Sequence, residues 1–204
     1  MASWEKFHEV FLWILRITYL NLLWLGFTIL GLGIFGLFPA TGALFSIVSQ
    51  WFKREPVEKI FKTFRSIYRK EFFPLNKFGI LFILAGYILF YDFLLIQMNG
   101  DRLKFLYPVI LIVGAIYIIT LLYFFPTYIR FDLKFFQYFK QSFLIAASSV
   151  LETMIIITAL LLLSIIIRFL PGIIPFYTGS VMAVVITWCY NRAIERIKAF
   201  KENH

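Results

Sequence analysis

The chain has 204 residues, of which 61% are hydrophobic and 15% charged, and its mean hydropathy is +0.85. A soluble domain of this length could not bury so much apolar surface, so the composition excludes a soluble globular protein and indicates a membrane protein. The net charge of +9 comes from basic residues that lie between apolar runs, which favours a membrane surface over nucleic acid as their contact.

The apolar runs predict an all-α fold, a polytopic membrane helix bundle made by a single domain over residues 1–204. Five segments are long enough to cross about 30 Å of hydrocarbon at about 1.5 Å per residue. They cover approximately residues 11–38, 78–96, 106–129, 143–167 and 173–190.

The stretch over residues 31–55, which begins inside the first of these segments, carries residues that a continuous helix disfavours, among them Gly36 and Pro39. Proline has no amide donor and restricts the residue before it, so the helix is expected to stop or kink near residues 36–38. Residues 40–52 would then form a short helix at the cytoplasmic interface. The pattern leaves open whether the break is a plain bend or a hinge.

Two further segments have the pattern of amphipathic interfacial helices. Residues 57–72 repeat apolar side chains at three- and four-residue steps, and residues 131–142 do the same. The first helix has a basic face made of Lys59, Lys62, Arg65, Arg69 and Lys70. Both helices are expected to lie on the cytoplasmic surface of the membrane, and a docking surface for another protein is the alternative.

The distribution of Lys and Arg predicts the orientation of the chain. In order along the chain, the N-terminus, the four connections and the C-terminus carry 2, 8, 2, 3, 1 and 4 of them, so 15 fall on one side and 5 on the other. Basic connections stay in the cytoplasm. We therefore expect a multi-pass protein of the cell membrane with its N-terminus outside and its C-terminus in the cytoplasm.

Four polar residues lie inside the predicted spans. Arg16 and Asp92 have similar depths, Glu152 lies in the inner half of the fourth span, and Asn21 is a possible neighbour of Glu152. Charges in hydrocarbon are costly, so an ion pair between Arg16 and Asp92 and a hydrogen-bonded Glu152 are one interpretation. The other is a proton or cation path in which Asp92 and Glu152 are relay carboxylates.

Motifs for catalysis and cofactor binding are absent from the sequence. It has no GxxxxGK[ST] loop for ATP and no HExxH metal motif, and His8 and His204 stand near opposite ends of the chain. We therefore expect no enzyme activity, no metal or other cofactor and no direct ATP binding.

Three stretches of the sequence resemble the YesL-like membrane proteins of Firmicutes. They are NLLWLGFTILGLGIFGLFPATGALFSIVSQWF, IFKTFRSIYRKEFF and YFFPTYIRFDLKFFQYFKQSFLIA, and they extend to about residue 150. The matching positions are Asn21, Trp24, Leu25, Gly31, Gly36, Pro39, Ala40, Ala43, Phe61, Phe64, Tyr68, Phe72, Pro126, Arg130, Phe131 and Asp132.

The resemblance implies a role in carbohydrate import. YesL-like proteins tend to be encoded beside carbohydrate ABC importers, so the chain is expected to be an accessory subunit that binds or stabilises the permease in a Gram-positive bacterium. The family supplies no catalytic residues. The alternative is a small secondary transporter or channel that uses Asp92 and Glu152, and an enzyme acting on lipid or glycan carriers is a third.

Overall fold

The computed structural model describes residues 2–57, 59–98 and 104–202, and every regular element in them is helical. The α-helices are α1 (Ala2–Leu30), α2 (Ile34–Phe52), α3 (Ile60–Met98), α4 (Tyr107–Arg130), α5 (Phe135–Ser148), α6 (Val150–Phe169) and α7 (Ile174–Glu202), with short 3₁₀ helices η2 (Lys104–Leu106) and η3 (Pro171–Ile173). Six segments are long and apolar enough to cross a membrane. The all-α polytopic bundle is confirmed, with six candidate spans where the sequence predicted about five.

The chain reverses between α1 and α2 in a turn at residues 31–33. The Gly33 amide donates to the Thr28 carbonyl and the Leu32 amide to the Ile29 carbonyl, which is the Schellman pattern that ends helices. Leu32 and Gly33 both have positive φ, 60° and 73°. At Leu32 this conformation costs about 1 kcal/mol, because an L side chain crowds the backbone there.

The helix break predicted at Gly36 and Pro39 is therefore wrong in its position. Pro39 lies inside α2, where its missing N–H removes only the bond to the Phe35 carbonyl in the first turn. Gly36 has a different role, because a Cβ there would collide with the carbonyls of Phe27 and Thr28. The two helices can thus approach closely at their turn.

Helix α2 is the centre of the molecule, and the prediction of a short interfacial helix over residues 40–52 is wrong. It packs against α1, α3, α4 and α7, and 10 of its 19 residues are buried. Its Phe38 stacks on Phe82 of α3, and its Phe45 stacks on Phe125 of α4. A helix that is apolar on most of its circumference is typical of a core. The prediction missed this because it ended the preceding helix at Pro39.

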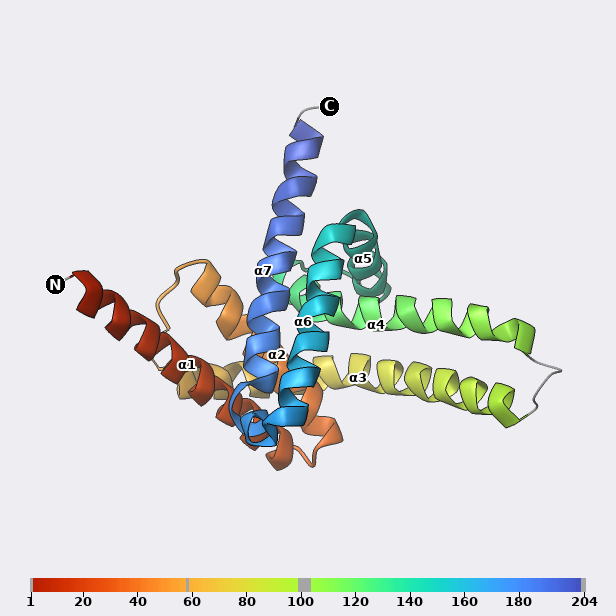
Figure 1. Cartoon of the computed structure of the whole chain (residues 1–204), viewed down its shortest axis with the longest axis horizontal. Coiled ribbons are helices and arrows are strands. Elements are labelled where there is room, and N and C mark those ends of the chain that lie inside the picture. The colour runs from red at the N-terminus through yellow and green to blue at the C-terminus, as the bar shows by residue number, and fades with distance from the viewer. Residues whose placement is uncertain (1, 58, 99–103, 203–204) are drawn as a thin grey trace.

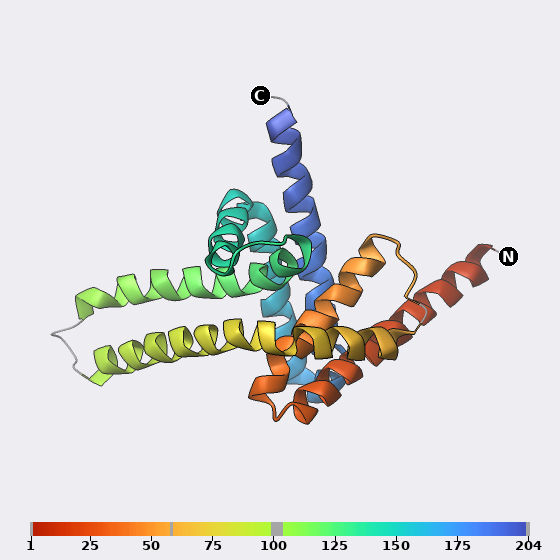
Figure 2. The ribbon, with the colours of Figure 1, turned by 180° about the vertical axis from the view of Figure 1, so that it is seen from behind.

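The segments predicted as an interfacial helix (57–72) and a span (78–96) form one 39-residue helix, α3. Pro74 lies inside it without ending it. The first half of α3 crosses the α1–α2 hairpin, with Phe64 against Phe27 and Gly79 against Phe38. The second half pairs with α4, and the two project as an arm that stands away from the other described helices in both views (Figures 1 and 2).

The remaining boundaries also differ from the prediction. The fourth span was expected from residue 143, but α5 runs to Ser148, and α6 begins at Val150 after a break at Ser149. The interfacial helix expected over 131–142 is in effect α5. The last helix, expected to end at residue 190, continues to Glu202. It pairs with α6 and α1, and it projects beyond them at its C-terminal end (Figure 1).

Candidate functional site

The break between α5 and α6 sets the geometry of the main buried polar cluster. Ser149 leaves helical geometry at φ −127° and ψ 58°, and its side chain makes no cap. The Thr153 hydroxyl lies 3.0 Å from the Ser149 carbonyl oxygen and 3.3 Å from that of Ala146, and so compensates for lost helix bonds. Tyr123 of α4 lies 3.0 Å from the Thr153 hydroxyl and fixes this turn to the core.

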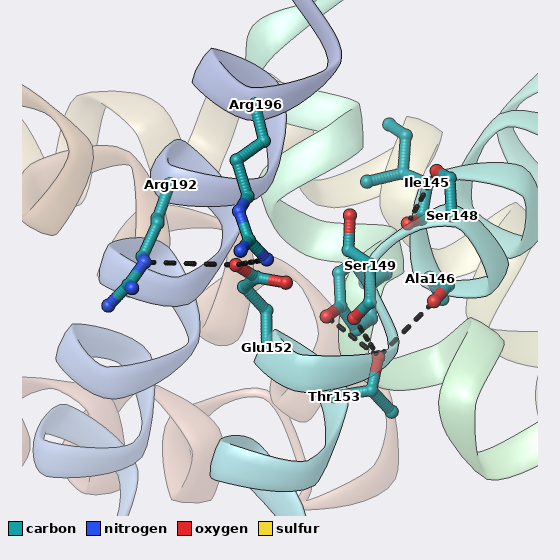
Figure 3. A network of polar contacts seen from close by, with 9 residues as sticks. Ile145, Ala146, Ser148, Ser149, Glu152, Thr153, Arg192 and Arg196 are labelled. Atoms are coloured by element: carbon teal, nitrogen blue, oxygen red, sulfur yellow. Dashed lines mark hydrogen bonds and ion pairs between the residues drawn. The ribbon is translucent and has the colours of Figure 1, made fainter. Parts of the chain in front are cut away.

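Glu152 stands in the first turn of α6 and is 1% exposed, so its charge requires partners. Arg196 Nη1 of α7 lies 3.1 Å from Glu152 Oε1, and Arg192 Nε lies 3.8 Å from the same oxygen. Figure 3 shows both guanidinium groups approaching the carboxylate from α7. The side chains of the two arginines are about half exposed, so the cluster is buried at Glu152 and accessible from outside at α7.

The geometry of this Glu152 cluster is that of a brace between helices. One carboxylate oxygen binds the arginines, and the other, Oε2, has no hydrogen-bond partner among the described residues. The carboxylate also lies at the N-terminal end of α6, where the helix dipole favours a negative charge. Breaking such a pair from the arginine side would leave a buried, uncompensated charge, which costs about 3–5 kcal/mol.

Asn21 is fully buried, as a polar residue inside a span should be, but it does not contact Glu152. Its Nδ2 donates to the Pro175 carbonyl at 2.7 Å, and its Oδ1 accepts from the Ser180 amide at 2.9 Å and from the Ser180 hydroxyl at 3.2 Å. These bonds join α1 to the start of α7, so Asn21 is a second brace in the bundle.

The ion pair between Arg16 and Asp92 does not form among the described residues, and that interpretation is wrong. Arg16 is exposed and lines a pocket with Trp13, Trp51 and Arg54, at the end of the α1–α2 hairpin away from its turn. Asp92 is on the projecting part of α3, because α3 crosses the hairpin instead of running beside α1. Asp92 and Glu152 likewise lie on separate helices, α3 and α6, and the ion-pair partners of Glu152 in the described part of the chain are arginines of α7.

The predicted basic face of residues 59–70 is divided by the fold. Lys59, Lys62, Arg65, Arg69 and Lys70 are all exposed. Arg65 and Arg69 line a groove beside the α1–α2 turn, whereas Lys70 lines a pocket with Ser49 and Lys53 at the C-terminal end of α2. Arg65 and Arg69 therefore lie at a different place from Lys70.

Sequence reasoning missed the two partners of Glu152, Arg192 and Arg196. They were counted in a C-terminal tail because the last span was ended at residue 190. A signal was present, since residues 189, 192, 193 and 196 stand at helical three- and four-residue spacing across that point. The bond from Tyr128 to Glu71 Oε2, 2.6 Å long, joins α4 to α3 and was also missed.

Comparison with known proteins places the chain in a family. The family model described as "Protein of unknown function, DUF624" matches residues 17–93. Three proteins of Bacillus subtilis (strain 168), each described as uncharacterized, are similar over most of their length. YteU is 36% identical over 94% of this chain and 85% of its own, YesV is 30% identical over 91% and 90%, and YesL is 30% identical over 86% and 83%.

No solved structure matches the chain. The family model covers the second half of α1, all of α2 and most of α3. With a relative at 36% identity over nearly its whole length, the chain belongs to the DUF624 family of YesL-like membrane proteins, the family that its first 150 residues resemble.

Proposed function

We propose that the chain is an accessory membrane subunit that binds and stabilises the permease of an oligosaccharide ABC importer in the cell membrane, without a reaction of its own. The observation that carries the proposal is the arm formed by the second half of α3 and the first half of α4. Both views show this arm standing away from the other described helices (Figures 1 and 2).

The arm has the surface that a helix–helix contact inside a membrane requires. Its side chains are apolar and open, with Leu84 56% exposed, Phe90 61% and Ile112 61%. Gly114 has no atom near the position of a missing Cβ, so another helix could approach its backbone closely. Internally the arm is held by the Tyr117 hydroxyl, which donates to the Phe82 carbonyl at 3.0 Å.

The polar residues favour this proposal over a transporter that uses Asp92 and Glu152. A relay needs two carboxylates joined by protein groups or water. Here Glu152 is bound by two arginines near the start of α6, and Asp92 is on the arm. Glu152 therefore supports the fold of the accessory subunit, and the arm remains for the partner.

Tagged protein, extracted from the membranes of its native host in mild detergent, should recover the permease subunits. Gly114→Leu should reduce this recovery, because the larger side chain would keep a partner helix away from the arm. Gly172→Leu, at another open glycine, should leave the recovery unchanged. Recovery of the chain alone or as a homo-oligomer in every case would contradict the proposal.

A further inference from the structure

A groove of about 680 Å³ beside the α1–α2 turn lies apart from both the Glu152 cluster and the arm. It is formed by the end of α1, the turn, the start of α2 and the first half of α3. Its walls are apolar, and they include Phe27, Leu30, Leu32, Phe35, Phe61 and Phe72. Arg65 and Arg69 are the charged residues of its lining.

The two arginines are one helical turn apart on α3, and both are exposed. No acidic residue lines the groove, and neither arginine makes an ion pair within the part of the chain that the structure describes. Like charges at this spacing destabilise a helix. Arg192 and Arg196 have the same spacing, but Glu152 compensates their charges, whereas Arg65 and Arg69 have no such carboxylate. An anion between the two guanidinium groups would supply it, and phosphate suits their planar donors.

The apolar side of the groove is open to the surroundings. Leu30 is 76% exposed, Leu32 is 85% exposed and Phe61 is 45% exposed. The left-handed conformation of Leu32 holds this wall at the tip of the hairpin. Tyr68 closes the floor, because its hydroxyl donates to the Phe27 carbonyl at 3.2 Å. Apolar walls with two cations among them match an amphiphile with an anionic head.

We propose that this groove binds an anionic phospholipid, with the phosphate on Arg65 and Arg69 and an acyl chain along the phenylalanine and leucine wall. Charge distinguishes this occupant from a zwitterionic lipid, since the lining offers two cations and no carboxylate for a choline group. The site is distinct from the proposed permease contact, which lies on the other half of α3.

The test is native mass spectrometry of the full chain in detergent, titrated with dioleoyl phosphatidylglycerol or dioleoyl phosphatidylcholine. The wild type should retain phosphatidylglycerol as a one-to-one adduct, with an affinity about tenfold above that for phosphatidylcholine. Arg65→Gln with Arg69→Gln should abolish the difference. Lys62→Gln with Lys77→Gln removes the same charge from exposed positions on the same helix outside the groove, and should preserve it.

Several outcomes would overturn the proposal. Equal affinity of the wild type for the two lipids would do so without any variant, and equal loss in both double variants would show a diffuse charge effect. Displacement of the lipid by inorganic phosphate alone would indicate a phosphate site without an acyl-chain groove. A dimer that is lost in the Arg65→Gln, Arg69→Gln variant would show that a second copy covers the groove.

Phe35→Asn, which keeps both arginines, should weaken phosphatidylglycerol retention, and unchanged retention would also count against the proposal.

Discussion

At the scale of single residues, Glu152 shows how the bundle tolerates a buried charge. The carboxylate is almost fully enclosed, yet the guanidinium groups that bind it are about half exposed. The arginines therefore keep part of their hydration while the carboxylate gains a charge-assisted hydrogen bond. The consequence is an asymmetry, since loss of the arginines should cost more than loss of the carboxylate.

We predict that Arg192→Gln with Arg196→Gln lowers the free energy of unfolding by about 3 kcal/mol, because Glu152 is left buried without a counter-charge. Adding Glu152→Gln to this double variant should recover most of the loss. Thermal unfolding in detergent measures both effects. A triple variant no more stable than the double would show that the arginines act in some other way.

The polar residues of the spans were found from sequence, but their partners were not. Asn21 and Glu152 could be identified as residues that must be satisfied inside the bundle, because a polar group in an apolar run is conspicuous. Their partners lie 40 to 159 residues away, on a helix whose extent was misjudged. Depth alone suggested Arg16 for Asp92, and depth carries no information about which helices are neighbours.

At the scale of elements, the central position of α2 depends on close packing through small residues. An added Cβ at Gly79 of α3 would lie 2.7 Å from Phe38 Cδ2 of α2, where Phe38 also stacks on Phe82. The aromatic ring is enclosed and has little room to move. A methyl group at Gly79 should therefore separate α3 from α2.

We predict that Gly79→Ala destabilises the protein by about 1–3 kcal/mol through overpacking. The matched control is Gly114→Ala, inside α4, where a Cβ meets no other atom. It should be neutral or stabilising by up to about 1 kcal/mol, since alanine favours a helix over glycine. Thermal unfolding in detergent compares the two, and equal effects would contradict the packing of α3 on α2.

The helical class and the membrane character of the chain were predictable because hydropathy is local, whereas one of the six candidate spans, α2, was not recognised as such. The boundaries failed where proline and glycine were given too much weight. Pro39 and Pro74 lie inside helices, and the reversal occurs at Leu32 and Gly33, where hydrogen bonds to Thr28 and Ile29 end α1. Gly31 and Gly33 flank this turn, but the residue type gives no sign of a positive φ at Leu32, so the reversal was placed too far along the chain.

At the scale of the whole molecule, the α1–α2 hairpin changes the expected orientation. Trp13 lies 6.4 Å from Trp51 between ring centroids, so the first half of α1 is beside the end of α2. If both helices cross the membrane, the N-terminus is on the same side as residues 53–59, the α4–α5 connection and the C-terminus. Leaving aside the five basic residues of α3, which crosses the hairpin, 12 Lys and Arg fall on that side and 3 on the other.

We therefore propose that both termini are cytoplasmic, in place of an external N-terminus. Cys189 is buried, so single cysteines can be added with little background. In intact cells, a membrane-impermeant maleimide should label Gly172→Cys and should not label His8→Cys or Lys53→Cys. Labelling of His8→Cys without Lys53→Cys would restore the external N-terminus.

The accessory role is tested most directly by photocrosslinking from two surfaces of equal exposure. Ile112 on the arm is 61% exposed and Leu161 on α6 is 60% exposed. A photoreactive residue is placed at each position in turn, in the native host, and the adducts are identified by mass spectrometry. The permease subunits should be captured from position 112 and not from position 161. Capture of lipid or of the chain itself alone from position 112 would contradict the proposal that the arm binds a permease.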